Sequence, residues 1–433
     1  MAIRLPQNPD GHQYEDMVAS WLQALGYFTE TRIKLREGTS ELLELDVVAS
    51  RSDVYDQRRI LVEAKKGTAK FSDIFKVYGW RSYLEIDEGC LVHKDAVEEY
   101  KVNSLHKLSQ EIKVHTEHLD VTDLSPTSCL MMLNNLEKGT FTDIVGAAWY
   151  KQLAIRESYA NFITKCKSHP DVELFRMATN YDRDIQASFF NKDVASRIFN
   201  LYSAYQTCPR ITGDLISFIQ TNQNPNQRNI WDEVYNTRNY LWLQYLMLIE
   251  HRARLHVMKN ALDYLIEKEQ YESKHEDQGI DWGSELELLL PENFKKGMKK
   301  LINLEYAPRV PYFLQIFIEI FGGFYLPHSK DEELLEKISG IKKSNIPEAL
   351  ETYNDFFPFR KSWFYDFGDL KLLKMVPAFI RGSGCFARTI TYKLKSYRDY
   401  SILAHSVLKK WHSAIYKTLE PILGYDEIDE REH

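Results

Sequence analysis

Apolar positions near the start of the chain recur with the period of a helix. Their spacing of i, i+3, i+4, i+7, i+8 and i+11 defines one face, and Gly26 stands where a helix of this length would end. The residues of this face are Tyr14, Met17, Val18, Trp21, Leu22 and Leu25. The pattern therefore predicts an amphipathic helix that ends at Gly26.

Short apolar runs follow this helix up to residue 120. They predict strands at 27–34, 42–49, 59–64, 89–93 and 112–115, helices at 71–84 and 95–108, and a polar turn at 51–57. Strands that alternate with helices indicate an α/β fold in which helices flank a central mixed sheet.

Helical periodicity dominates after residue 135. The clearest helices are predicted at 141–166, 183–206 and 236–270, and polar breaks interrupt the region at 221–230 and 272–284. We therefore expect an α/β domain over residues 1–135, followed by a large, mostly α-helical region over 136–433 that is subdivided near the two breaks.

Composition narrows the class of protein. Of the 433 residues, 44% are hydrophobic and 27% are charged, as in ordinary globular chains. The apolar runs are too short to span a membrane and the start does not resemble a signal peptide, so we expect a cytoplasmic protein without a membrane partner. Five scattered cysteines argue against a disulfide framework or a zinc site. A net charge of -7 excludes a uniformly basic coat, but it is compatible with a local nucleic-acid surface.

Three charged residues stand inside two of the predicted strands. Asp46 lies in LLELDVVA, and Glu63 and Lys65 lie in ILVEAKKG. If the two strands pair antiparallel across the 51–57 turn, Asp46 comes close to Glu63. Side chains two apart on a strand share a face, so Glu63 and Lys65 would point the same way. The opposite face would carry Ile60, Val62 and Ala64.

Such a group of side chains suits metal-assisted hydrolysis of phosphodiester bonds. Two carboxylates can hold Mg²⁺, with Mn²⁺ as a substitute, while water and a substrate phosphate complete the coordination shell. A lysine beside them can orient the attacking water and offset negative charge. The alternative is an exposed ion pair. An aspartate inside an apolar strand argues against it, because strands disfavour Asp and unpaired burial is costly.

The series Asp46, then Glu63-Ala64-Lys65, resembles the signature of the PD-(D/E)xK nuclease superfamily, which has the restriction-endonuclease-like fold. The order of helix, strand, strand with Asp, strand with ExK, helix and strand is similar as well. Tyr14-Glu15 and Leu25-Gly26-Tyr27 resemble the opening helix of the Mrr-type branch. The resemblance covers residues 10–120, with Leu45 in the place of the proline in the motif's name.

The resemblance implies that Asp46 and Glu63 bind the metal, that Lys65 is the catalytic lysine, and that Glu15 is an auxiliary acid. For Glu15 the alternative is an exposed carboxylate in an early helical turn. The implied activity is that of a Mg²⁺-dependent DNA endonuclease in restriction or anti-phage defence. Two alternatives stay open: an RNA-cleaving, toxin-like nuclease on the same site, and a binding or assembly protein that uses the fold for recognition.

Basic residues near this motif and near the C-terminus are candidates for contacts with nucleic acid. They are Lys66, Lys70, Lys76, Arg81, Lys393, Lys395 and Arg398. The last three lie in a stretch, 381–410, where basic and tyrosine residues alternate, which suits phosphate contacts and base stacking; a solvated helix face is the alternative. In the helix predicted at 71–84, Tyr78 and Trp80 are expected in the core, and stacking on bases is the alternative. The helical region is also a candidate surface for self-association or for a partner protein.

Overall fold

A computed structural model of the chain describes twelve segments, and all structural statements below refer to them. They are residues 5–38, 40–53, 56–124, 136–168, 185–191, 193, 195–203, 241–274, 288–325, 330–358, 364–366 and 371–373. None of the helices described there is long and apolar enough to cross a membrane.

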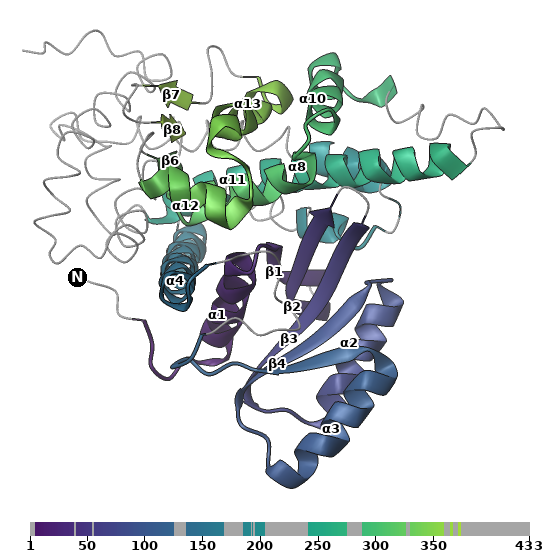
Figure 1. Cartoon of the computed structure of the whole chain (residues 1–433), viewed down its shortest axis with the longest axis vertical. Coiled ribbons are helices and arrows are strands. Elements are labelled where there is room, and N and C mark those ends of the chain that lie inside the picture. The colour runs from purple at the N-terminus through teal and green to yellow at the C-terminus, as the bar shows by residue number, and fades with distance from the viewer. Residues whose placement is uncertain are drawn as a thin grey trace, which may run out of the picture.

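A five-stranded mixed sheet forms the N-terminal part of the fold (Figure 1). Its strands, in spatial order, are β1 (Phe28–Glu37), β2 (Ser40–Asp53), β3 (Asp56–Thr68), β4 (Glu88–Asp95) and β5 (Val114–His118). The β1–β2 and β2–β3 pairs are antiparallel, whereas β3–β4 and β4–β5 are parallel. The parallel pairs need crossover connections, which are α2 (Phe71–Tyr83) and α3 (Glu99–Ile112). The predicted mixed sheet with flanking helices is therefore confirmed.

The turn between β2 and β3 is shorter than predicted. Both strands continue into the segment 51–57, since β2 extends to Asp53 and β3 begins at Asp56. Antiparallel pairing persists to Asp53↔Asp56, because the hydrogen bonds of a strand pair are formed by the backbone of polar and apolar residues alike.

The last helix and strand of the sheet lie further along the chain than predicted. Asp95 ends β4 instead of beginning a helix, and Ile112 ends α3 instead of beginning a strand. The boundary between α3 and β5 is set by Lys113, whose backbone φ of 54° is left-handed. A residue in that conformation ends a helix.

Helix α1 (Gly11–Ala24) packs on the sheet with its predicted apolar face buried. A capping box starts it, in which the Gln13 N–H donates to Asp10 Oδ1 at 2.7 Å and the Asp10 N–H donates to Gln13 Oε1 at 2.9 Å. Gly26, with φ 102°, follows its end as predicted. Polar residues on its other face are buried as well: Asp16, Ser20 and Gln23. From Asp16 to Ala24, helix α1 is therefore buried on all sides, and it is not an amphipathic surface helix.

The region after residue 135 is mostly helical, as predicted. Its helices are α4 (Lys138–Ser168), α8 (Leu241–Lys274), α10 (Glu292–Ile302), α11 (Val310–Glu319), α12 (Lys330–Ser339) and α13 (Ile346–Phe356). A small antiparallel sheet of β6 (Phe324–Tyr325), β8 (Lys371–Leu373) and β7 (Phe364–Asp366) accompanies them. The single helix predicted at 183–206 is wrong, because residues 185–188 and 195–203 are helical on either side of a turn at 189–190.

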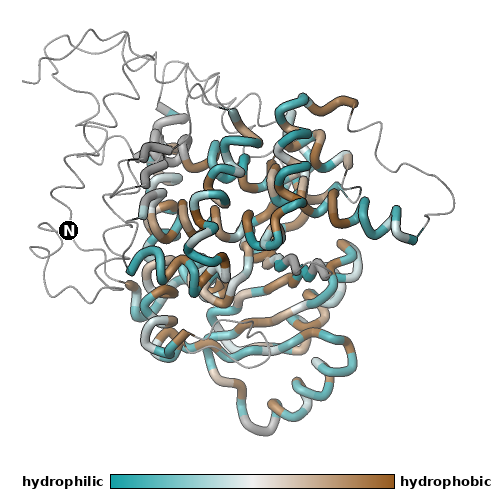
Figure 2. The backbone as a smooth tube through the Cα atoms, turned by 45° about the horizontal axis from the view of Figure 1, so that its top comes forward, coloured by the Kyte–Doolittle hydropathy of each residue, from teal (hydrophilic) through white to brown (hydrophobic). Residues whose placement is uncertain are grey.

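Each face of the large sheet has its own apolar cluster. On one face, Leu61 and Leu91 pack with residues of α2 and α3. On the other, the predicted face of Ile60, Val62 and Ala64 packs with α1, and this cluster continues into α4, α8 and α11. Figure 2 shows hydrophobic residues along the strands and along the helices that meet them. The predicted domain boundary at 135 and the break at 221–230 lie outside the described residues, as does most of the break at 272–284.

Candidate active site

The pairing of β2 with β3 ends beside Asp46. The last regular pair is Val47↔Val62, so the next residues along the two strands are Asp46 and Glu63. Asp46 Oδ2 accepts the Ala64 N–H at 2.9 Å. The carboxylate thus takes the place that a β2 carbonyl would have in the ladder, and it is brought next to Glu63.

The electrostatic surroundings of Asp46 disfavour its charged form. Burial, followed by the negative charges of Glu63 and Glu15, raises its pKa to about 7, although the Ala64 N–H and the charge of Lys76 act in the opposite direction. In the part of the chain that the structure describes, Asp46 accepts this one N–H and forms no ion pair. A cation bound beside it would relieve the repulsion.

Lysines surround the second carboxylate. Glu63 is 8% exposed, and Lys76 Nζ donates to its two oxygens at 2.7 and 2.8 Å. Lys65 Nζ lies 3.8 Å from Glu63 Oε1 and 3.1 Å from Asp73 Oδ1. Burial lowers the pKa of Lys65, but the bond to Asp73 and the neighbouring carboxylates outweigh it and raise that pKa overall. Lys65 is therefore a stable ammonium held at the site.

Asp73 is a site residue that the sequence analysis missed. Its Oδ2 accepts the Lys70 N–H at 3.1 Å at the start of α2, while Oδ1 contacts Lys65. One carboxylate thereby joins the helix start to the strand that carries Lys65. The available signal was an acid in the first turn of the predicted 71–84 helix, where carboxylates commonly cap backbone N–H groups.

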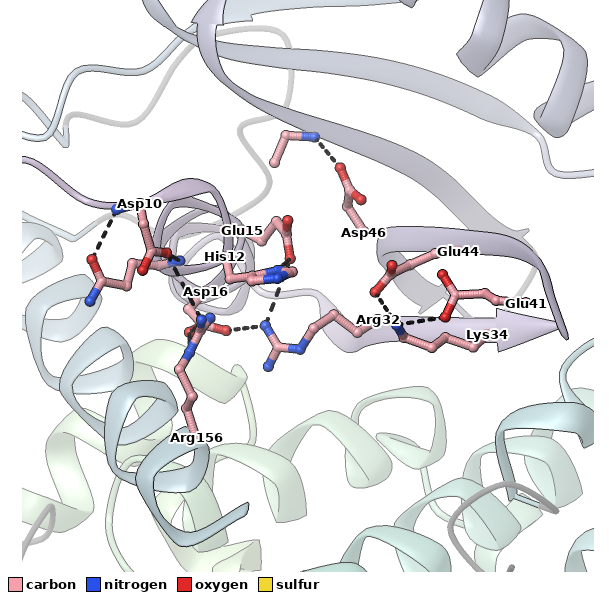
Figure 3. A network of polar contacts seen from close by, with 12 residues as sticks. Asp10, His12, Glu15, Asp16, Arg32, Lys34, Glu41, Glu44, Asp46 and Arg156 are labelled. Carbon is pink, nitrogen blue, oxygen red and sulfur yellow. Dashed lines mark hydrogen bonds and ion pairs between the residues drawn. The ribbon is translucent and has the colours of Figure 1, made fainter. Parts of the chain in front are cut away.

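Glu15 extends from α1 towards the space beside Asp46 (Figure 3). Its side chain is 13% exposed and lies 3.2 Å from His12 Nδ1 and 3.8 Å from Arg32 Nη1. Burial raises its pKa against the opposing effects of His12 and Arg32. The alternative of an exposed carboxylate is therefore wrong, and three acidic side chains influence one another here.

A buried ionic network lies directly behind Glu15. Asp16 is fully buried; its Oδ1 accepts from Arg32 Nη1 at 2.5 Å, and its Oδ2 accepts from Arg156 Nε and Nη2 at 3.0 and 2.5 Å (Figure 3). Arg32 lies in β1 with φ 51°, a left-handed conformation that costs a non-glycine residue about 1–3 kcal/mol. Because Arg156 belongs to α4, the helical region helps to hold the helix that carries Glu15.

The remaining basic candidates near the site differ in their surroundings. Lys66 is exposed near the end of β3, and Lys70 is exposed at the start of α2. Lys76 is bound to Glu63, and Arg81 Nη1 donates to the Lys113 carbonyl at 2.8 Å beyond the end of α3. Their contacts with nucleic acid stay predictions.

Two aromatic residues of α2 and three distant basic residues complete the predicted set. Tyr78 is 40% exposed, so its predicted place in the core is wrong, because it lies on the side of α2 turned away from the sheet. Trp80 is partly buried, as predicted, and packs against the apolar cluster that Leu61 and Leu91 form with residues of α2 and α3. Lys393, Lys395 and Arg398 lie outside the described residues.

The donor set fits a hard divalent cation with two protein ligands. Among the described residues, no group of three or more His, Cys, Asp or Glu side chains has an arrangement that could hold a metal. Asp46 and Glu63 supply two carboxylates whose repulsion a cation would offset, and Mg²⁺ commonly keeps several waters beside one or two carboxylates.

No protein-family model, no curated protein and no solved structure matches this chain.

Proposed function

We propose that this chain is a metal-dependent nuclease that hydrolyses phosphodiester bonds in DNA, and that its N-terminal part has the restriction-endonuclease-like fold. The observation that carries the proposal is the pair of facing carboxylates, Asp46 and Glu63, with the ammonium of Lys65 on the same strand as Glu63. By the resemblance of these residues to the PD-(D/E)xK superfamily, we further propose an endonuclease that acts in restriction or anti-phage defence.

Each residue has a separate part in the proposed reaction. The Ala64 N–H orients the Asp46 carboxylate through Oδ2 and leaves Oδ1 for another ligand. Lys76 must release an oxygen of Glu63 before that carboxylate can bind a metal. Bound Mg²⁺ lowers the pKa of a coordinated water and offsets charge on the phosphate. Lys65, held by Asp73, donates towards the attacking water or the phosphate oxygens.

The test is an incubation of the purified full chain with supercoiled plasmid, linear DNA and RNA, each with Mg²⁺ or with a chelator. We expect cleavage of DNA that requires Mg²⁺ and that falls by about 10³-fold or more in Lys65→Ala and Asp46→Asn. Lys138→Ala is the matched control, because Lys138 is exposed and lies in α4.

Two outcomes would change the proposal. Cleavage at the wild-type rate by either site variant would remove the site assignment. Cleavage of RNA in preference to DNA would keep the site and change the substrate, because the chemistry at the phosphate does not depend on the sugar.

A further inference from the structure

The solvent-facing side of α2 is rich in aromatic residues. Phe71, Phe75 and Tyr78 recur at i, i+4 and i+7, and they are 43%, 54% and 40% exposed. The neighbouring exposed residues on this side are small: Ser72, Gly79 and Ser82. A surface helix ordinarily presents charged and polar residues to solvent, but the exposed residues of α2 include one charged residue, Lys76, and a fourth ring, that of Tyr83 at the end of the helix. Phe71, Phe75 and Tyr78 lie on one side with the three small residues beside them. These six residues are called the α2 aromatic face below.

Gly79 gives a second indication that this face makes a contact. It lies inside α2, where glycine is less stable than alanine. A Cβ added at Gly79 would meet no atom within 4 Å, so packing within the chain does not explain the glycine. A helix surface without a side chain at this point allows a ligand to approach the backbone closely.

The helix that carries the α2 aromatic face starts beside the proposed active site. Phe71 is the first residue of α2 and directly follows Lys70, at the corner where Asp73 contacts Lys65. The 13 residues of α2 extend over roughly 20 Å from that corner. A strand that leaves the site along α2 would therefore meet the three rings in succession.

Positive charges border the α2 aromatic face on several sides. Lys66 and Lys70 are exposed at the end nearest the site, and Lys76 is exposed along one side of the helix. On another side, the Arg81 guanidinium lies 5.8 Å from the centre of the Tyr78 ring. Uncharged rings for bases, bordered by cations for phosphates, are the combination by which proteins bind single strands without sequence preference.

We propose that the α2 aromatic face binds unpaired nucleotides of the substrate, whose bases stack on Phe71, Phe75 and Tyr78 while Lys66 and Lys70 contact phosphates. The inference rests on the proposed nuclease function and names its substrate class, a nucleic acid with a single-stranded segment beside the bond to be cut. A stable protein interface uses about 20–30 residues from each partner, far more than this single helix face supplies. Three rings in a row match a few nucleotides instead.

The experiment measures binding of the full chain, in chelator so that nothing is cut, to three labelled probes. These are a single strand of about 12 nucleotides, the duplex of the same sequence, and that duplex with an unpaired overhang. We expect the two probes with unpaired nucleotides to bind more tightly than the duplex. Phe75→Ala and Tyr78→Ala should each weaken binding of those two probes by about tenfold, and should leave duplex binding unchanged.

Gly79→Gln separates loss of binding from loss of folding. Glutamine favours a helix more than glycine does, so this variant should raise the melting temperature while it weakens binding to the single strand. The matched controls are Phe199→Ala, at an exposed phenylalanine in the helical segment 195–203, and Gly139→Gln, at a glycine of α4 with no atom within 4 Å of an added Cβ. Both should bind the three probes like the wild type.

Each further outcome contradicts one proposal or both. Equal affinity for all probes, unchanged by Phe75→Ala, together with Mg²⁺-dependent cleavage, would overturn the substrate class and leave the nuclease intact. A wild-type dimer that Gly79→Gln dissociates, with unaltered nucleic-acid binding, would make the face a contact between copies of the chain. Failure of the wild type to bind or cut any nucleic acid would overturn both proposals.

Discussion

Asp16 and Asp46 are two carboxylates on neighbouring elements, and their surroundings are opposite. Asp16, on α1, is fully buried and bonded to the guanidinium groups of Arg32 and Arg156. Asp46, on β2, accepts one backbone N–H and faces the carboxylate of Glu63, and its pKa is raised to about 7. The first charge is compensated within the chain, whereas burial and the charges of Glu63 and Glu15 disfavour the second more than Lys76 favours it.

This difference separates a charge that stabilises the fold, that of Asp16, from one that can bind a ligand, that of Asp46. A buried ion costs several kcal/mol unless it is paired, so the pairing of Asp16 explains its place in the core. Carboxylates that repel one another persist where a ligand relieves the repulsion, and groups with strongly shifted pKa values are concentrated at functional sites. We therefore expect substitutions at the two aspartates to act in opposite directions on stability.

Removing the charge of Asp16 should have the largest effect on stability. Asp16→Asn removes the buried charge that the guanidinium groups of Arg32 and Arg156 share, and leaves them only the longer contacts with Glu15 and Asp10. The free energy of unfolding should therefore fall by about 3 kcal/mol. Urea denaturation at neutral pH measures it, with Asp123→Asn as a control at an exposed position that should change it by less than about 0.5 kcal/mol. A loss at Asp16 no greater than that of the control would show that the network is not structural.

Removing the charge of Asp46 should stabilise the protein. Asn can still accept the Ala64 N–H but does not repel Glu63, so in the absence of metal Asp46→Asn should raise the free energy of unfolding by about 1–2 kcal/mol at roughly pH 8. The folded pKa is above the unfolded one, so the penalty of the wild-type carboxylate develops as pH rises from about 4 to about 7. The gain should therefore vanish near pH 4. A destabilised variant at pH 8 would mean that Asp46 is a structural residue like Asp16.

The proposed cleavage should depend on pH through the same carboxylate. A protonated Asp46 cannot bind Mg²⁺, so kcat/KM should fall by about tenfold per unit as pH drops below about 7. Raising the Mg²⁺ concentration should move the midpoint to lower pH, because metal and proton compete for one group. A rate that is constant between about pH 5.5 and 8 would contradict the assignment of Asp46 as a ligand.

The smallest expected effect is on Mg²⁺ affinity, and it comes from removing the ammonium of Lys76, which already pairs with Glu63. Lys76→Met removes the ammonium that competes with a metal for both Glu63 oxygens, so Mg²⁺ affinity should rise by about 3- to 10-fold. Calorimetric titration without nucleic acid measures it. Lys101→Met is the matched control, because Lys101 contacts Glu98 in an exposed pair remote from the site. Unchanged affinity in Lys76→Met would show that Lys76 does not oppose metal binding.

Local sequence patterns predicted much of the first part of the fold. The helical period of α1, the apolar runs of the first strands and the start of α2 at Phe71 agree with the structure, since each depends on neighbours within a few residues. The closeness of Asp46 and Glu63 was predictable for the same reason, because two antiparallel strands joined by a short connection have a defined register.

Boundaries that depend on one backbone conformation were not predicted. The left-handed Lys113 ends α3 without glycine or asparagine to indicate it. Nor did the pattern of α2 show that Tyr78 is exposed, because aromatic residues at helical spacing are found in cores more often than on surfaces.

The sequence by itself determined the helical and strand periods, the place of the acidic and basic residues on adjacent strands, and the predominance of helical periodicity after residue 135. Tertiary structure alone decided that Asp73 holds Lys65, that Arg156 pairs with Asp16 across 140 residues, and that Gln315 of α11 bonds both backbone groups of Thr29 on β1 across 286 residues. Periodicity reports which face of an element is apolar, but it does not identify the distant element that covers the polar face. That choice depends on the packing of the whole core. It buries α1 from Asp16 to Ala24 and joins the helical region to the proposed site.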